Sequence, residues 1–259
     1  MLDTLHMALG VLSGAMVGFS LGLVGGGGSI LAVPLMVYLV GVKSPHIAIG
    51  TSALAVAANA ALGLFNHARH GTVNWRCGLM YAAAGIAGAF AGSTAGKAFD
   101  GQRLLFLFAI VMIVVGVLML RRRNQLGIEG AQCDRDNAPK VLGYGLATGA
   151  FSGFFGIGGG FLIVPGLIAS TSMPMINAVG TSLVAVTAFG LTTGFNYALS
   201  GLVDWLLAAL FIGGGVIGSL AGTKAAKRLS GGGHLTSTFA VLIFVVAAYM
   251  LWKSAGETF

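Results

Sequence analysis

Charged side chains are scarce in this sequence: they make up 8% of its 259 residues, against about 25% in a typical soluble domain. Hydrophobic residues account for 56% of the chain. A soluble fold of this length could not bury that much apolar surface, because a large part of any folded surface stays in contact with solvent. The shortage of charge therefore excludes an ordinary soluble domain and predicts an all-α, polytopic membrane protein in contact with the lipid bilayer.

Acidic side chains are the scarcest, with 7 Asp and Glu residues against 14 Lys and Arg. Proton-coupled carriers and cation pumps normally keep an ionisable residue inside the membrane. We expect no carboxylate there, because all fall in loops, at chain ends, in a linker or at a helix start: Asp3, Asp100, Glu129, Asp134, Asp136, Asp204 and Glu257. This pattern argues against cation transport and weakens the case for proton coupling.

Cysteine occurs only twice, at Cys77 and Cys133, in unrelated contexts without metal-type spacing, so we expect two free thiols. No histidine cluster has the spacing of metal ligands either. We therefore predict neither a metal nor a cofactor. An enzyme would need an acid, a base, a nucleophile or a metal in a cavity, and only hydroxyls and amides are available, so we predict no enzymatic activity.

Basic residues give the chain a formal charge of +7. Such an excess could indicate a nucleic-acid partner, but Lys and Arg also collect in the cytoplasmic loops of membrane proteins. We favour the second interpretation and predict no binding to nucleic acid. The N-terminus lacks the basic region of a cleavable signal peptide, so we expect the first apolar segment to remain as a transmembrane element.

Hydrophobic segments fall into two sets of five, on either side of a polar stretch. Their approximate bounds are 7–24, 29–41, 46–66, 77–96 and 103–120, then 141–156, 160–171, 175–199, 205–223 and 235–252. We therefore divide the chain into a first membrane repeat over 1–120, a cytoplasmic linker over 121–139 and a second membrane repeat over 140–259.

The second half of the chain repeats the first. At an offset of 131, Gly22, Gly25, Gly27, Gly28 and Pro34 match Gly153, Gly156, Gly158, Gly159 and Pro165. At an offset of 130, Gly50-Thr51-Ser52 matches Gly180-Thr181-Ser182, and Asn66 matches Asn196. Duplicated halves are a common construction for secondary transporters, with the substrate site between them.

Each half contains a glycine cluster inside an apolar segment: Gly25 to Gly28 followed by Ser29, and Gly156 to Gly160. Glycine weakens helices, so we expect a break at each cluster. A helix that starts there presents unpaired N–H groups, which carry partial positive charge and attract anions. A nucleotide-binding loop is excluded because no Gly-Lys-Ser/Thr follows, whereas simple close packing of helices on glycine stays open.

If each break is a kink within one span, the two halves are parallel. If each break is the tip of a hairpin, the two halves are inverted. The hairpin arrangement places 10 Lys and Arg residues on one side of the membrane and 4 on the other, whereas the kink arrangement gives 8 and 6. Because basic residues concentrate in the cytoplasm, we predict two inverted repeats. Each consists of a glycine-tipped helical hairpin and three transmembrane helices, with both termini outside.

Polar residues recur at sevenfold spacing after each glycine cluster, so that they share one helical face. They are Ser52, Asn59 and Asn66, with Ser182, Phe189 and Asn196 at the matching positions. We interpret this face and the tips as a substrate site for a small anion, although a helix-end cap at Asn66 and Asn196 stays open. The candidate substrate-binding residues are Gly26, Gly27, Gly28, Ser29, Thr51, Ser52, Asn59, Asn66, Gly158, Gly159, Gly160, Thr181, Ser182 and Asn196.

Two further glycine triplets, each made of successive G-x-x-x-G steps, predict close-packing faces at helix or protomer contacts. They are Gly88, Gly92 and Gly96 in the first half, and Gly214, Gly218 and Gly222 in the second. A homodimer that forms through these glycine-rich helix faces is a further prediction.

The doubled glycine clusters, the proline after each one and the repeated Gly-Thr-Ser together resemble the sulfite/sulfonate exporter TauE/SafE family of bacterial membrane proteins. The resemblance covers nearly the whole chain. It implies export of small sulfur oxyanions or organosulfonates, such as sulfite, sulfoacetate or thiosulfate, across the bacterial plasma (inner) membrane. Gly160 stands in place of Ser29 and Phe189 in place of Asn59, so equal roles for the two tips are not expected.

The energetics of export follow from the charge of the solute. An anion that leaves a negatively charged cytoplasm gains about 2.3 kcal/mol per charge per 100 mV. We therefore predict passive export driven by the membrane potential. The alternatives are a proton-coupled anion transporter and, less favoured, a membrane-embedded assembly factor or enzyme.

Overall fold

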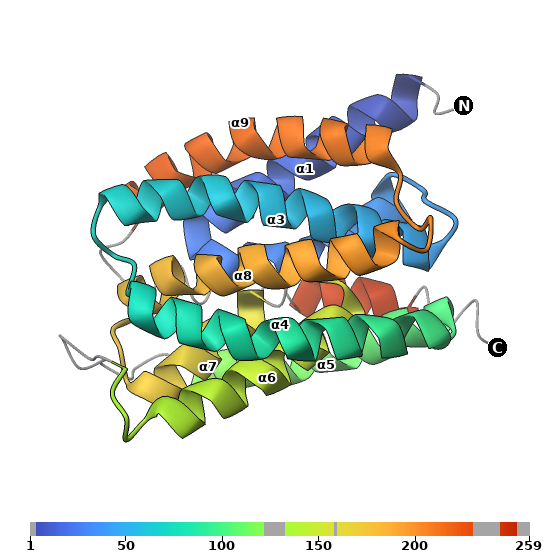
Figure 1. The fold of residues 1–259 in the computed structure, drawn as a ribbon. Coiled ribbons are helices and arrows are strands. Elements are labelled where there is room, and N and C mark those ends of the chain that lie inside the picture. The colour runs from blue at the N-terminus through green and yellow to red at the C-terminus, as the bar shows by residue number, and fades with distance from the viewer. Residues whose placement is uncertain (1–3, 122–132, 158–159, 230–243, 253–259) are drawn as a thin grey trace.

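The computed structural model describes residues 4–121, 133–157, 160–229 and 244–252, and all regular elements within these ranges are helical (Figure 1). The predicted linker falls largely in the gap at 122–132, outside the described residues. The elements are α1 Thr4–Val24, a 3-10 helix η1 Gly25–Leu31, α2 Ala32–Pro34, a π-helix η2 Leu35–Leu39, α3 Pro45–Arg69, α4 Trp75–Ala98, α5 Gly101–Arg121, α6 Ala138–Phe155, α7 Gly160–Thr171, α8 Met175–Ala198, α9 Trp205–Leu229 and a last helical stretch over 244–252.

Within these residues, five helices are long and apolar enough to cross a membrane: α1, α3, α4, α8 and α9. Shorter apolar helices lie over 28–39, 101–114 and 160–171. The segments 28–39 and 160–171 are too short to cross about 30 Å of hydrocarbon alone, whereas 101–114 is part of the 21-residue helix α5. Helical elements throughout the described residues and five candidate spans confirm the prediction of an all-α, multi-pass membrane protein.

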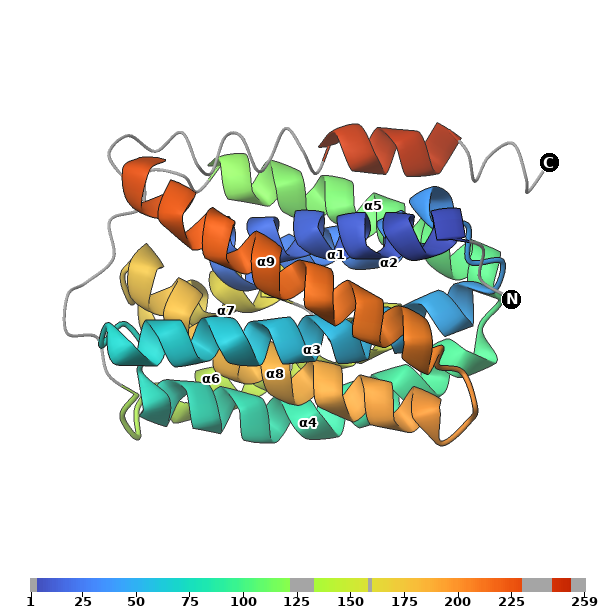
Figure 2. The ribbon, with the colours of Figure 1, turned by 90° about the horizontal axis from the view of Figure 1, so that it is seen from above.

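The two halves of the chain are packed into each other. The most extensive helix pairs are α1 with α9, α4 with α6, and α3 with α8, and each pair joins one helix from each half. Figure 1 shows α3 beside α8 and α4 beside α6, and Figure 2 shows α9 lying across α1 and α3. The repeat makes α1 equivalent to α6 and α4 equivalent to α9, so the first two pairs are the same contact made twice.

The equivalent helices α3 and α8 run antiparallel. Near the start of α3, Thr51 Oγ1 accepts a hydrogen bond of 3.0 Å from the backbone N–H of Asp204, which follows α8. Near the start of α8, Thr181 Oγ1 accepts one of 2.9 Å from the N–H of Asn74, which follows α3. Each helix therefore begins beside the end of the other, which is the arrangement that inverted repeats require.

The glycine clusters interrupt the helices, and the chain reverses at both of them. In the first half, α1 is followed by η1, α2 and η2. This returning segment ends beside the start of α1, because a Cβ on Gly41 would lie 3.8 Å from His6 Nε2. In the second half, α6 ends at Phe155, and Gly156 has a φ of +68°, which favours glycine. The returning helix α7 lies beside α6, since a Cβ on Gly166 would be 3.5 Å from Thr148 Cγ2. Both clusters are hairpin tips rather than kinks.

The two G-x-x-x-G triplets pack against helices of the same chain. Side chains at Gly88, Gly92 and Gly96 would meet the backbone of α6, and side chains at Gly214, Gly218 and Gly222 would meet the backbone of α1. The predicted close packing is therefore confirmed at helix contacts within the chain. A homodimer stays a prediction, and it needs a surface other than these faces.

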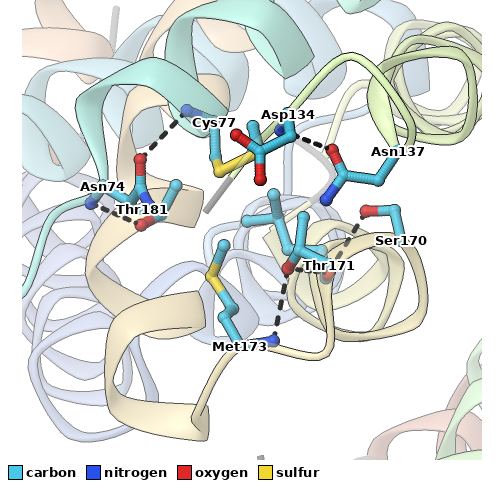
Figure 3. The surroundings of a disulfide bond; sticks show 10 residues. Asn74, Cys77, Asp134, Asn137, Ser170, Thr171, Met173 and Thr181 are labelled. Atoms are coloured by element: carbon cyan, nitrogen blue, oxygen red, sulfur yellow. Dashed lines mark hydrogen bonds between the residues drawn. A yellow bond between two sulfur atoms is a disulfide. The ribbon is translucent and has the colours of Figure 1, made fainter. Parts of the chain in front are cut away.

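The expectation of two free thiols is wrong, because Cys77 and Cys133 form a disulfide (Figure 3). Cys77 lies in the first turn of α4, and Cys133 lies just before the turn that leads into α6. The helices α4 and α6 run side by side in the same direction, since Gly145 contacts Tyr81 and Gly153 contacts Ala89. Their starts therefore meet, and residues separated by 56 positions come within 5.3 Å between Cα atoms.

The cysteine pair gives a direct test of membrane orientation. Its end of the molecule carries Arg69 and Arg76 and adjoins the basic linker, so we expect this end to face the cytoplasm. Because cytoplasmic thiols are kept reduced, we expect Cys77 and Cys133 to be reduced in growing cells and to pair when the purified protein meets a mild oxidant. Maleimide labelling of acid-quenched, denatured samples measures this, with Cys133→Ser as the control. A pair already oxidised in cells would reverse the predicted orientation.

Candidate functional site

The first hairpin tip is a tight turn of 3-10 helix. Gly26 and Gly27 lie within η1, and Gly28 and Ser29 are buried. A Cβ on Gly28 would collide with the backbone of Ser20 and Leu21 in α1, so the tip folds directly back onto the helix before it. Only glycine allows an approach this close.

The second hairpin tip lies beside the start of α3. A Cβ on Gly156 would collide with the side chain of Ile49, and the buried Gly160 begins α7. Gly158 and Gly159 lie outside the described residues. The element η1 packs against α7, so the segment of the first tip meets the helix that leaves the second tip. The first N–H groups of α7 have no acceptor in their own helix, and they point toward the tip.

The hydroxyls of the two Gly-Thr-Ser motifs hold the helices together. Thr51 and Thr181 make the bonds that join the halves, and they lie at opposite ends of the α3–α8 pair. Ser52 donates to the carbonyl of Ile49 at 3.1 Å, and Ser182 donates to the carbonyl of Val179 at 2.7 Å. All four hydroxyls therefore have partners within the chain.

Asn196 belongs to a polar cluster between α8 and α4. Its Nδ2 donates to Ser93 Oγ at 2.6 Å and to Thr94 Oγ1 at 3.0 Å. Its Oδ1 accepts from Lys97 Nζ at 2.9 Å. Both ends of this amide are occupied by α4. Its sequence match, Asn66, lies half-buried near the far end of α3, because α3 and α8 run antiparallel. The structure does not bring these two candidates together.

Asn59 differs from the other candidates because it is buried and unpaired. It is 1% exposed, and neither its amide nitrogen nor its amide oxygen has a hydrogen-bond partner among the described residues. It lies in the middle of α3, against Gly215 of α9, where a Cβ would collide with the amide. Its counterpart Phe189 lies in the same way against Gly85 of α4. At equivalent positions of the two repeats, α3 thus carries an amide and α8 carries an aromatic ring.

A second set of buried polar groups, not predicted from the sequence, lies near the end of α8. Thr193 and Tyr197 are fully buried, and their hydroxyls have no partner in the described ranges. Neither residue is among the substrate-binding candidates predicted from the sequence. Their spacing of four residues, one helical turn, was the available signal.

The carboxylates that the structure describes lie between helices, as expected. They are Asp100, Asp134, Asp136 and Asp204. Asp100 and Asp204 accept hydrogen bonds from backbone N–H groups at the starts of α5 and α9, at 3.0 Å and 2.9 Å. In the same ranges, no group of three or more His, Cys, Asp or Glu side chains could hold a metal ion.

Comparison with known proteins identifies the family. The family model described as "Sulfite exporter TauE/SafE" matches residues 10–250. A "Probable membrane transporter protein" of Xylella fastidiosa (strain 9a5c) is 53% identical over 93% of this chain and 94% of its own length. The "Probable membrane transporter protein YdhB" of Bacillus subtilis is 27% identical over 81% of this chain and 86% of its own length.

The similarity extends to an archaeal protein. The "Probable membrane transporter protein MJ0441" of Methanocaldococcus jannaschii is 27% identical over 91% of this chain and 93% of its own length. No solved structure matches the chain. A family match over nearly the whole length, together with a fold of membrane-spanning helices, means that this chain belongs to the TauE/SafE family and is a multi-pass membrane transporter.

Proposed function

We propose that this transporter exports small sulfur-containing oxyanions, such as sulfite or an organosulfonate, from the cytoplasm. The family description, "Sulfite exporter TauE/SafE", supports the class of substrate. The observation that carries the proposal is the pair of interrupted helices. A helix that begins inside the protein, as α7 does at the buried Gly160, offers N–H groups and partial positive charge to an anion.

The substrate site is proposed at the tips and at the centre of α3. At the second tip the start of α7 at Gly160 supplies backbone N–H groups, and the residues from Gly26 to Ser29 in η1 line the first tip. Asn59 supplies the side-chain amide, because a buried amide without partners is rare and costly in a folded protein. The hydroxyls of Thr51, Ser52, Thr181 and Ser182 shape the surroundings of the tips, and Asn66 and Asn196 fix the helix ends.

We further infer that the halves are inverted across the membrane. The antiparallel packing of α3 and α8 supports this, as do the two hairpins that reverse at their glycine tips. In this arrangement one hairpin enters from each side of the membrane. A solute held between them can then be released to either side as the halves rearrange.

Export is proposed to be passive and electrogenic. The described carboxylates lie between helices rather than within them, so they offer no proton-carrying group inside the spans. A potential of 100 mV is worth about 2.3 kcal/mol per charge, or roughly a fifty-fold concentration ratio for a monovalent anion. No further energy source is needed to clear an anion from the cytoplasm.

Voltage dependence tests this proposal. Proteoliposomes are loaded with a labelled sulfonate, which stays ionised at every working pH, and a potassium gradient with valinomycin sets the potential. We expect efflux to accelerate severalfold when the interior is made negative and to ignore a pH gradient at zero voltage. Protein-free liposomes are the control. Flux that follows the pH gradient instead would favour the proton-coupled alternative, and a complete absence of flux would favour an assembly factor or enzyme.

A further inference from the structure

A group of unpaired polar side chains is buried at the end of α8. The hydroxyls of Thr193 and Tyr197 and the Nδ1 atom of His46 are buried, and none of them has a hydrogen-bond partner in the part of the chain that is described. Thr193 and Tyr197 are both 0% exposed. Buried polar groups are almost always paired, so neighbouring unpaired ones require an explanation.

His46 and Tyr197 are neighbours, and Thr193 precedes Tyr197 by one turn of α8. Thr193 and Tyr197 are one helical turn apart and share a face of α8. The ring of His46, in the first turn of α3, lies 6.3 Å from the ring of Tyr197 between centroids. The close approach of α3 requires Gly50, where a Cβ would lie 2.7 Å from Tyr197 Cβ. The cluster is therefore built by the crossing of α3 and α8, beside the second hairpin tip at Gly156 and Ile49.

Lys97 places a positive charge over this cluster. Its ammonium group is 5.9 Å from the centre of the Tyr197 ring. It donates to the carbonyl and the side chain of Asn196 at 3.1 Å and 2.9 Å, and to Ser200 Oγ at 2.9 Å. The half-buried Lys97 thus joins the end of α4 to the end of α8 beside the cluster.

Among the described residues, the equivalent positions at the other end of the α3–α8 pair carry no such cluster. The residues that match Thr193, Tyr197 and His46 at the repeat offset of 130 are Gly63, His67 and Ile176. The imidazole of His67 is paired with Thr72 Oγ1 at 2.8 Å. The unpaired groups therefore belong to one end of the molecule only, the end opposite Cys77 and Cys133.

We propose that Thr193, Tyr197 and His46 form a second anion site, and that Lys97 closes it from the surface. Its ligand is a small oxyanion such as a sulfite or sulfonate group, whose oxygens accept hydrogen bonds from the two hydroxyls and from an imidazole N–H. The inference rests on the proposed anion transport. In the predicted orientation this end faces outward, so the site is the last one that an exported anion occupies.

Two buried tyrosines provide the matched test. Tyr197 and Tyr81 are both 0% exposed, but the hydroxyl of Tyr81 is hydrogen-bonded to Thr148 at 2.8 Å. We expect Tyr197→Phe to weaken the binding of sodium sulfite and of methanesulfonate to the purified transporter about tenfold, without lowering its Tm. Tyr81→Phe is expected to lower the Tm and to leave both affinities unchanged. Calorimetry and thermal unfolding measure the two effects.

The outcomes separate this site from the proposed function. Wild-type protein that neither binds nor transports these anions overturns both proposals. Wild-type protein that transports them, with unchanged binding in Tyr197→Phe and in Thr193→Val, overturns the second site alone. A fall in the Tm of Tyr197→Phe equal to that of Tyr81→Phe, with unchanged affinity, also overturns it, because the hydroxyl would then have a structural partner such as a water molecule.

Discussion

Gly149→Leu is expected to abolish accumulation of the folded protein. Gly149 lies on the face of α6 that packs against α4, and a Cβ there would lie 2.6 Å from the Cα atom of Gly85. The obstacle is backbone, so no side chain can rotate away, and a leucine must push two of the most extensively packed helices apart. Overpacking of a core costs about 1–3 kcal/mol when neighbours can adjust, and this contact leaves little room for adjustment.

The same helix provides the control for this change. Gly143 is exposed on α6, and a Cβ there would meet nothing within 4 Å. We therefore expect Gly143→Leu to give wild-type yield and a wild-type elution profile in detergent, measured side by side with Gly149→Leu by fluorescence-detected size exclusion. Equal yields for the two variants would contradict the parallel α4–α6 contact, and with it the equivalent contact of α1 with α9.

Much of the fold was predictable because the chain contains its pattern twice. The clusters at Gly25 and Gly156 interrupt an apolar segment at matching positions, and glycine destabilises helices for a local reason that needs no knowledge of the fold. The distribution of Lys and Arg then favoured hairpins over kinks. The pairing of Cys77 with Cys133 was not predictable in this way, because it depends on α4 and α6 running side by side in one direction.

Where the candidate site residues lie relative to one another could not be predicted from their recurrence in the sequence. Asn66 and Asn196 were placed near the substrate because they recur in both halves, yet the antiparallel helices carry them to opposite ends, and Asn196 is fully engaged by α4. Thr51 and Thr181 recur because each makes the same bond between the halves. Recurrence in a duplicated chain therefore marks contacts that both halves need for folding. A position at which the two halves differ, such as Asn59 in the first half and Phe189 in the second, is the better guide to a single site between the halves.

Asn59→Leu is expected to eliminate transport and to leave the protein at least as stable as the wild type. An unpaired buried amide costs about 1–3 kcal/mol, and leucine fills a similar volume without a polar group. The Asn59 amide makes no hydrogen bond within the described residues, so its replacement removes no hydrogen bond from the folded state there. The anion, however, loses the one side-chain amide that we place at the centre of its path. Sulfonate flux in proteoliposomes and the Tm of the same preparation measure both effects.

Asn196→Leu is the matched control, because the two asparagines were equal candidates in the sequence and differ in their partners. Removal of the Asn196 amide takes one hydrogen bond each from Ser93, Thr94 and Lys97, so we expect a loss of about 1–3 kcal/mol of stability and a lower Tm. Wild-type flux in Asn59→Leu would remove Asn59 from the substrate path. A large fall in its Tm would mean that its amide has a structural partner. Lost flux at an undiminished Tm is the result that separates a transport residue from a packing residue, because only loss of a packing contact lowers the free energy of unfolding.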